Sequence, residues 1–396
     1  MDERRIAHIV EQVVARLATD GKAPVVLRHG LGTPAHGGRG VHPTVDAAVT
    51  AATRAFQALK QTSLADRERY IAALRRATLG MLEDISRMAV EETGLGRYDD
   101  KLVKNMLVAD KTPGTEILRP EAWTGDHGLT LVEWAPYGVI GSITPCTNPT
   151  ETILNNGIGM LAAGNAVVFN THPNAKAVSA FFIDALNAAI EAEGGPSEIF
   201  NCVATPTIES AQALMKHPGI RLLAVTGGGG VVKAAMTSGK RAIAAGPGNP
   251  PAVVDETADL EQVARDVVFG ASLDNNIICI VEKEIIAVAD IADALKRKMK
   301  AHDAVELTGR DIKRMEQLII TPDNHVNRKY IGKDPHLIAA DAGIRLPEST
   351  RLIFCEVDEQ HPFVQHEMLM PVVGLVRVPD VDSAIDCAVR VEHGYG

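Results

Sequence analysis

Apolar positions recur at helical spacing through much of the first hundred residues. Between Asp2 and Ala18 they lie on one stripe, which predicts an amphipathic helix. Residues 19–43 are rich in Gly, Pro and His and are typical of a flexible linker. From Thr44 to Gly94 the spacing is helical again, with Ser63 placed to cap one helix and Gly94 to end the last.

Farther along the chain the pattern changes to short apolar runs that alternate with helix-length segments. We expect strands at residues 130–134, 138–143, 166–170, 199–204 and 222–226, and helices at residues 150–163, 175–193 and 208–216. Such alternation indicates right-handed βαβ crossovers and a largely parallel sheet covered by helices on both faces. Ligands of such sheets bind at the carboxyl ends of the strands.

A second α/β region follows, from about Gly246 to Glu367. It has a helical pattern at residues 291–302 and a strand pattern at residues 351–357. Two sets of alternating elements predict two α/β domains, and the cleft between domains is the default ligand site. The expected parts of the chain are residues 1–18, 19–43, 44–245, 246–380 and 381–396.

Two interpretations of the N-terminal helix remain open from the residues alone. A short amphipathic helix on a flexible tether is typical of a peptide that binds in a partner's groove. The same pattern also fits a helix that folds back on its own domain. A membrane-surface role is disfavoured, because the polar face mixes acidic and basic residues and offers no aromatic anchor.

Composition narrows the class of protein. With 396 residues, 46% of them hydrophobic and 23% charged, the chain can bury more than one core. The net charge of −10 argues against nucleic acid or an anionic membrane as the main partner. We find no signal peptide and no apolar run of membrane-spanning length, so a cytoplasmic protein is expected.

The five cysteines are widely spaced, odd in number and without a CxxC pair. Neither a disulfide framework nor a zinc site is therefore expected, and a reducing compartment fits best. Irregularly spaced histidines in the linker are better explained as solvated residues than as metal ligands.

Two of the predicted strand ends carry candidate chemistry. Thr226 is followed by four glycines that open a helix near Val231, where backbone amides and the helix dipole can receive a pyrophosphate. A glycine run is also typical of a merely flexible turn, and it matches neither GxGxxG nor the P-loop. The other strand end is the rigid turn Thr144–Pro149, which carries the amide side chain of Asn148.

Cys279 is the candidate nucleophile. It follows two asparagines and precedes an apolar run, and by itself such a cysteine is more often a small buried hydrophobic residue. A nucleophilic role requires a route to the thiolate and donors for the oxygen that becomes negative on attack. Those requirements can be met only by residues from elsewhere in the chain.

Five motifs, in this order, resemble the aldehyde dehydrogenase superfamily. Within it they look like the coenzyme-A-acylating branch, the propionaldehyde or acetaldehyde dehydrogenases of bacterial microcompartments. The resemblance runs from about Val45 onward. The motifs are Thr144–Pro149, Ala163–Phe169, Thr226–Gly228, Asn275–Cys279 and Glu367–Pro371.

The resemblance implies a role for each matching residue. Cys279 would attack the aldehyde, and Asn148 would donate to the oxyanion together with the cysteine's own backbone N–H. Glu367 would hold the nicotinamide ribose, and Asn170 stands where the hydrolytic relatives carry a lysine. The residues expected to bind NAD, with NADP not excluded, are Thr144, Pro145, Asn170, Thr171, His172, Pro173, Thr226, Gly227, Gly228, Pro247, Gly248 and Glu367.

A second departure from the hydrolytic relatives is the stretch Ala245–Pro251. They place Glu-Leu-Gly-Gly there, and that glutamate activates water to release the acid. This stretch has no carboxylate, so a thioester on Cys279 should await a better nucleophile such as coenzyme A. We expect oxidation of propionaldehyde or acetaldehyde to the acyl-CoA. A hydrolytic dehydrogenase and an inactive cargo protein remain alternatives.

Further expectations follow from the same resemblance. Residues 1–18 would bind a microcompartment shell protein, which places the enzyme inside a microcompartment in the cytoplasm. The chain would form a homo-oligomer, with further strands beyond Gly396. Cys146 is the only rival nucleophile, and His361 or His366 could take the coenzyme A thiol proton, although structural or solvated roles are commoner for such histidines.

Overall fold

The computed structural model describes residues 38–394, and the chain divides into two compact units. The first unit contains the described residues up to Thr93 together with Lys101–Gly246, and the second contains Gly94–Asp100 and the residues from Pro247 onward. The predicted helix at residues 1–18 and most of the predicted linker lie outside the described residues. No helix within residues 38–394 combines the length and the apolar character that crossing a membrane requires.

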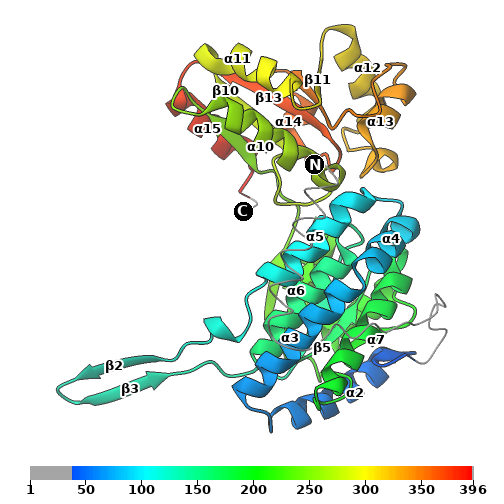
Figure 1. Cartoon of the computed structure of the whole chain (residues 1–396), viewed down its shortest axis with the longest axis vertical. Coiled ribbons are helices and arrows are strands. Elements are labelled where there is room, and N and C mark those ends of the chain that lie inside the picture. The colour runs from blue at the N-terminus through cyan, green and yellow to red at the C-terminus, as the bar shows by residue number, and fades with distance from the viewer. Residues whose placement is uncertain (1–37, 395–396) are drawn as a thin grey trace. The chain divides into compact units, whose positions relative to one another are not determined.

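A parallel sheet of six strands forms the centre of the first unit (Figure 1). Its strands are β1 (Val41–His42), β4 (Val139–Ile143), β5 (Ala166–Asn170), β6 (Phe200–Val203), β7 (Leu222–Thr226) and β8 (Ala242–Ala245). Their order across the sheet is β1-β6-β5-β4-β7-β8. The chain therefore runs from β4 to one side and returns through β7 to the other, and ligands of such sheets bind at this switch point.

Helices of the first unit cover this sheet and one another. They are α2 (Val45–Leu59), α3 (Leu64–Gly80), α4 (Leu82–Thr93), α5 (Tyr98–Lys111, from Lys101 on), α6 (Pro149–Ala162), α7 (Lys176–Ala192), α8 (Ile208–Lys216) and α9 (Gly229–Met236). Short 3₁₀ turns lie at Thr115–Ile117 and Pro173–Ala175. Ser63 caps α3 as predicted, because its hydroxyl accepts from the Asp66 N–H while the Asp66 carboxylate accepts from the Ser63 N–H.

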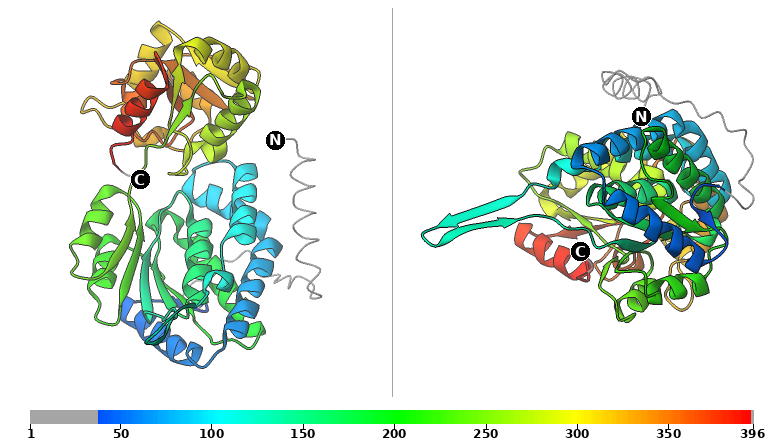
Figure 2. Two further views of the ribbon diagram at one scale, coloured as in Figure 1. Left: turned by 90° about the vertical axis from the view of Figure 1, so that its left-hand side faces the viewer. Right: turned by 90° about the horizontal axis from the view of Figure 1, so that it is seen from below.

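An antiparallel hairpin stands apart from the six-stranded sheet and projects from the first unit (Figure 2). Its strands are β2 (Glu121–Gly125) and β3 (Gly128–Val132), and every residue in them is exposed. The sequence predicted a strand at residues 130–134. The observed strand ends at Val132 because this residue pairs with Glu121, where the partner strand begins.

The end of the predicted linker also differs from expectation. Val41–His42 form the edge strand β1 instead of a free tether. The hydrogen bonds that hold it include one from the Cys202 N–H to the Gly40 carbonyl (2.7 Å) and one from the Ala204 N–H to the His42 carbonyl (2.8 Å). Pairing of this kind depends on a partner strand distant in sequence, which the linker's composition does not reveal.

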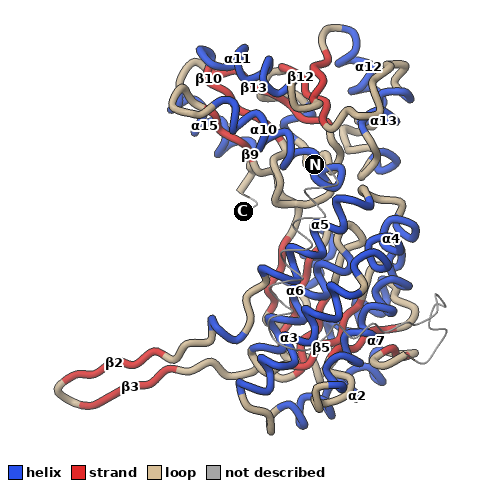
Figure 3. Tube along the Cα trace, in the orientation of Figure 1, coloured by secondary structure: helices blue, strands red, loops and turns tan. Residues whose placement is uncertain are grey.

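The second unit is built on a parallel sheet of five strands (Figure 3). The strands are β9 (Pro251–Val254), β10 (Glu284–Val288), β11 (Ala304–Leu307), β12 (Leu352–Glu356) and β13 (Val372–Val378), in the order β11-β12-β13-β10-β9. The helices are α10 (Leu260–Ser272), α11 (Ala289–Lys300), α12 (Arg310–Ile319), α13 (Pro335–Asp341), α14 (Pro362–Gln365) and α15 (Val381–Val391), with 3₁₀ turns η3 (Leu273–Asn276) and η4 (Arg328–Tyr330). The predicted α/β class with parallel sheets is confirmed.

Candidate active site

In the first unit, three of the predicted residues lie at the carboxyl ends of neighbouring strands. The Thr144 N–H, just after β4, donates to the carbonyl of Asn170 at the end of β5 (3.3 Å). Thr226 ends β7, which pairs with β4 on its other side. The carboxyl ends of β4, β5 and β7 therefore bring Thr144, Asn170 and Thr226 to the switch point of the sheet.

The side-chain amide of Asn148 has a fixed orientation. Asn148 is the N-cap residue of α6. The Lys104 ammonium donates to its Oδ1 atom (2.6 Å), and its Nδ2 atom donates to the Thr147 hydroxyl (3.0 Å). Because a lysine ammonium can only donate, the amide must present its oxygen to Lys104. The NH₂ end, which can donate to an anion, is thereby turned away from the lysine.

Lys104 is itself buried and paired. The residue is 5% exposed, and its ammonium lies 3.2 Å from the Glu151 carboxylate on α6. A buried charge normally requires a partner of the opposite sign. Glu151 meets that requirement. Lys104 therefore acts on Asn148 as a hydrogen-bond donor of fixed position, and its charge is largely balanced by Glu151.

The glycine run after β7 leaves open space at the start of a helix. Gly228 is the N-cap of α9, and no side chain caps this helix. A Cβ atom built on Gly228, Gly229 or Gly230 would meet no heavy atom within 4 Å. The first amides of α9 can therefore be approached closely by a phosphate group.

His172 serves local structure at the end of β5. Its Nδ1 atom accepts from the Asn174 N–H (3.1 Å), and burial lowers the pKa of its ring. Its neighbour Thr171 is buried. Their predicted contact with the adenosine half of the cofactor stays a prediction.

In the second unit, Cys279 lies in a turn between η3 and β10, where its side chain is half-buried. Three successive residues before it adopt the left-handed backbone region, with φ of 50° at Asp274, 55° at Asn275 and 62° at Asn276. Non-glycine residues rarely adopt this region, and each instance has a cost in free energy. A run of three therefore depends on contacts from outside the run.

Those contacts are hydrogen bonds made by all three side chains. The Asp274 carboxylate accepts from the Arg97 N–H (2.7 Å). Asn275 Nδ2 donates to the Gly332 carbonyl and to Asp334 Oδ1 (both 3.0 Å). Asn276 Nδ2 donates to the carbonyls of Ala271 (2.8 Å) and Glu282 (2.9 Å). Asp274 and Asn275 thus hold the loop to segments that are distant in sequence but belong to the same unit, and Asn276 holds it to its own flanks.

Gly248 and Glu367 lie close to the same loop. A Cβ atom at Gly248 would fall 2.7 Å from the Cys279 carbonyl oxygen, so only glycine fits against the Cys279 backbone. Burial raises the pKa of Glu367, against the opposing effects of the Lys283 charge and of the Gly248 N–H. The second unit therefore brings together three of the predicted residues, Cys279, Gly248 and Glu367.

The remaining cysteines are poorly suited to nucleophilic attack. Burial raises the pKa of the Cys202 and Cys355 thiols to about 12 and that of Cys387 to about 11. Burial also raises the pKa of Cys146, the rival in the Thr144–Pro149 turn. A raised pKa lowers the thiolate fraction at neutral pH.

The two histidines near Glu367 have local partners. His361 caps α14 by accepting from the Phe363 N–H (3.2 Å), and His366 approaches Asn324 Oδ1 (3.3 Å). Burial lowers the pKa of both rings. These contacts favour the structural role over proton transfer.

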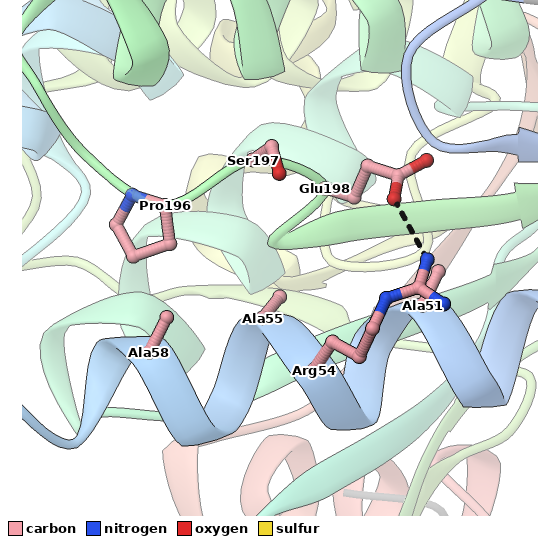
Figure 4. Close-up of a pocket in the computed structure, with 7 residues that line it drawn as sticks. All are labelled: Ala51, Arg54, Ala55, Ala58, Pro196, Ser197 and Glu198. Carbon is pink, nitrogen blue, oxygen red and sulfur yellow. Dashed lines mark hydrogen bonds and ion pairs between the residues drawn. The ribbon is translucent and has the colours of Figure 1, made fainter.

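Asn148 belongs to the first unit and Cys279 to the second. The catalytic roles implied for both stay predictions. A hollow of about 380 Å³ lies elsewhere, between α2 and the segment Pro196–Glu198 (Figure 4). None of the predicted site residues lines it, and the ion pair between Arg54 and Glu198 (3.5 Å) spans it.

The sequence did not single out Lys104 and Lys283, two of the three buried lysines of the described residues. Lys104 lies in a helical stretch of mixed charge, where no pattern distinguishes it. Lys283 had a visible signal, because it stands with Glu282 and Glu284 between the apolar run of Cys279 and a buried strand. Its ammonium donates to the Asn276 and Ile278 carbonyls (both 2.8 Å) and to Asn276 Oδ1 (2.6 Å).

Comparison with known proteins places this arrangement among enzymes that act on aldehydes. The model of the aldehyde dehydrogenase family matches residues 32–325. The acetylating acetaldehyde dehydrogenase of Salmonella typhimurium is 46% identical over 400 residues, which cover 100% of this chain and 83% of that protein.

Two solved structures are similar over most of the chain. Propionaldehyde dehydrogenase of Rhodopseudomonas palustris, with bound CoA and an acylated cysteine, superposes with a TM-score of 0.87 at 49% identity and covers 90% of this chain and 82% of that one. A propionaldehyde dehydrogenase from the fucose utilisation microcompartment of Clostridium phytofermentans gives a TM-score of 0.87 at 46% identity, with the same coverage of 90% and 82%.

Proposed function

The chain belongs to the aldehyde dehydrogenase family, and from this premise we propose that it is a coenzyme-A-acylating aldehyde dehydrogenase. It oxidises a short aldehyde, acetaldehyde or propionaldehyde, with a nicotinamide cofactor and passes the acyl group to coenzyme A. One observation favours coenzyme A over water as the acyl acceptor. Gly248 lies against the Cys279 carbonyl, and the stretch that contains it, Ala245–Pro251, has no carboxylate. A base that activates water is missing where hydrolysis would need it.

The chain's own groups perform the first step. The Cys279 thiolate adds to the aldehyde carbon and forms a hemithioacetal whose oxygen is negative. The Asn148 NH₂ group and the Cys279 backbone N–H donate to that oxygen, and removal of one such donor typically costs a factor of about 10²–10³ in rate. Lys104 contributes indirectly, because it holds the amide by its oxygen.

A nicotinamide cofactor, when bound, would supply the oxidation by accepting hydride from the same carbon, and Cys279 would then carry the acyl group as a thioester. Coenzyme A is the second substrate. Its thiolate attacks the thioester, the bond from the acyl carbon to the Cys279 sulfur breaks, and the Cys279 thiolate is restored. The acyl group thus leaves as acyl-CoA, and the enzyme needs no water.

The nicotinamide cofactor would be held at the switch point of the first unit and by Glu367. Its pyrophosphate fits the open start of α9 at Gly227 and Gly228, beside Thr226. The other proposed contacts are Thr144, Pro145, Asn170, Thr171, His172, Pro173, Pro247 and Gly248.

We also propose a homo-oligomer that is packaged in a microcompartment. The hairpin of β2 and β3 exposes Trp123 and Leu129, and Trp134 follows it with 73% of its surface exposed. Exposed apolar surface of this extent is typical of an interface. Residues 1–18 would bind the shell protein, and a variant lacking residues 1–20 should keep its activity but fail to co-purify with shells.

The direct test uses the purified protein with acetaldehyde or propionaldehyde and NAD⁺, with and without coenzyme A. We expect sustained NADH formation and acyl-CoA only when coenzyme A is present. Free acid formed at the same rate without coenzyme A would identify a hydrolytic dehydrogenase. No NADH under either condition would identify an inactive cargo protein.

A further inference from the structure

Lys283 follows Cys279 closely in sequence and is one of the largest fully buried side chains of the described residues, with 1% of its surface exposed. A lysine ammonium has three N–H donors. All three have acceptors in the loop that carries the nucleophile: the Asn276 carbonyl (2.8 Å), Asn276 Oδ1 (2.6 Å) and the Ile278 carbonyl (2.8 Å). The ammonium group therefore fixes this loop from inside the protein.

The three acceptors are uncharged. Within residues 38–394 Lys283 forms no ion pair, whereas Lys296 of the same unit meets the carboxylates of Glu306 (2.9 Å) and Glu356 (2.6 Å). A buried charge without a counter-ion has a large desolvation cost. A neutral side chain would fill the same volume at lower cost, so the charge itself requires an explanation.

The bond to Ile278 determines where the Cys279 N–H points. The Ile278 carbonyl and the Cys279 N–H belong to one peptide group, and none of the described peptide bonds is cis. In a planar trans peptide the carbonyl and the N–H point in opposite directions. Because Lys283 holds the carbonyl inward, the Cys279 N–H is directed away from Lys283.

We propose that Lys283 is a positioning residue for Cys279: it aims the backbone N–H of Cys279 at the reacting oxygen and supplies the positive charge that favours the thiolate. This inference rests on the proposed function of Cys279 as the nucleophile. It adds the source of two properties that the cysteine needs, a donor for the oxyanion and an ionised sulfur.

The charges around Lys283 support this role. Burial lowers the pKa of Lys283 to about 8, and the charges that oppose this effect most are those of Glu367 first and Cys279 next. The interaction is reciprocal, so an ammonium that is favoured by the thiolate also favours the thiolate. Burial raises the pKa of Glu284 to about 9, and this carboxyl is therefore uncharged at neutral pH and does not cancel the ammonium.

The first test is the pH dependence of Cys279 alkylation by iodoacetamide, followed by peptide mass spectrometry. Lys283→Met should raise the midpoint pH of the alkylation rate by about one unit or more, since an opposite charge nearby typically shifts a pKa by that amount. Lys296→Met is the matched control, because it removes a lysine of the same unit that is paired with carboxylates. It should leave the Cys279 midpoint unchanged. An unchanged midpoint in folded Lys283→Met would overturn the proposal.

A second measurement does not depend on the folding of the Lys283 variant. Lysine labelled with ¹³C allows the titration of Lys283 to be followed by NMR in the unmodified protein and in Cys279→Ser. Because the thiolate charge raises the pKa of Lys283, its loss should lower the Lys283 midpoint. Equal midpoints in the two proteins would contradict the coupling.

Neither measurement uses aldehyde, nicotinamide cofactor or coenzyme A. A protein that shows the coupling but makes no NADH would refute the proposed function and leave the charge interaction in place. A protein that makes acyl-CoA without any shift of the midpoint would refute the role of Lys283 alone.

Discussion

The Asn148 turn in the first unit and the Cys279 loop in the second are each held by a buried lysine, in opposite electrostatic settings. Lys104 donates to the Asn148 amide oxygen (2.6 Å) and pairs with the Glu151 carboxylate (3.2 Å). Lys283 donates only to uncharged oxygens of the Cys279 loop, and the described residues give it no ion pair.

This difference matches the chemistry proposed for each region. An amide needs only orientation to donate to an oxyanion, so the charge of Lys104 can be offset without loss. A thiol must ionise before it attacks, and a positive charge that no carboxylate of the described residues meets in an ion pair assists its ionisation. The same side chain therefore orients a neutral group in one unit and favours a charged group in the other.

The largest expected effect comes from the cysteine itself. Cys279→Ala should lower kcat by at least about 10³-fold, because no other group can then form the covalent bond to the aldehyde carbon. Steady-state NADH formation with propionaldehyde and coenzyme A measures the loss. Cys146→Ala, a control in the other unit, should retain a nucleophile and hence substantial activity. Full activity in Cys279→Ala would place the chemistry elsewhere.

The next largest effect concerns Asn148, the uncharged group of the two that are compared. Asn148→Ala should lower kcat by about 10²–10³-fold with little change in the alkylation of Cys279, because it removes an oxyanion donor and leaves the thiol untouched. Single-turnover formation of NADH separates this step from coenzyme A binding. A parallel fall in the alkylation rate would show that Asn148 acts on the cysteine rather than on the oxyanion.

The next prediction concerns the protonation state of Glu284, which follows Lys283 in the sequence, and its effect on the free energy of unfolding. Glu284 is 0% exposed, both its carboxyl oxygens lack a hydrogen-bond partner among the described residues, and burial raises its pKa from 4.5 to about 9. The folded protein therefore holds a proton that the unfolded chain releases, and the free energy of unfolding falls as pH rises from about 4.5 to about 9.

Glu284→Gln removes this titration. The variant should be more stable than the parent at pH 8 by on the order of 2 kcal/mol, with the difference shrinking toward pH 5. Urea unfolding at several pH values measures it. A constant difference across that range would mean that Glu284 does not change its protonation on folding.

The smallest effect concerns the orientation of the amide. Lys104→Met should lower kcat about 10-fold, which is less than the loss expected when an oxyanion donor is removed completely. The same change should destabilise the protein, because it leaves the buried Glu151 carboxylate without its ion-pair partner. The double variant Lys104→Met/Glu151→Gln should regain stability but not kcat. Recovery of both would show that Lys104 serves the fold and not Asn148.

Much of the fold could be predicted because local signals agreed with tertiary structure. The predicted strands at residues 166–170 and 222–226 match β5 and β7, and the predicted helix at residues 208–216 matches α8, which Thr207 caps. The strand β2 was missed because its residues are all exposed and lack an apolar face. Its pairing with β3 depends on a hairpin rather than on burial.

The site was only partly predictable. The family resemblance named Cys279 as the nucleophile and Gly248 and Glu367 as cofactor contacts, without saying that they lie together. The structure brings these three residues to one loop, and the roles implied for them stay predictions. The roles of Lys104 and Lys283 depend on which distant atoms their ammonium groups meet. The left-handed run before Cys279 depends likewise on Arg97 and Asp334, which no local pattern connects to it.

The central claim is that the acyl group on Cys279 resists water and yields to a thiol. The most direct measurement is to form the acyl-enzyme with propionaldehyde and NAD⁺, isolate it, and follow its decay by intact-protein mass spectrometry in buffer and with coenzyme A. The account predicts slow decay in buffer and rapid transfer to coenzyme A with release of the Cys279 thiol. Equally fast decay to propionate in buffer alone would contradict it.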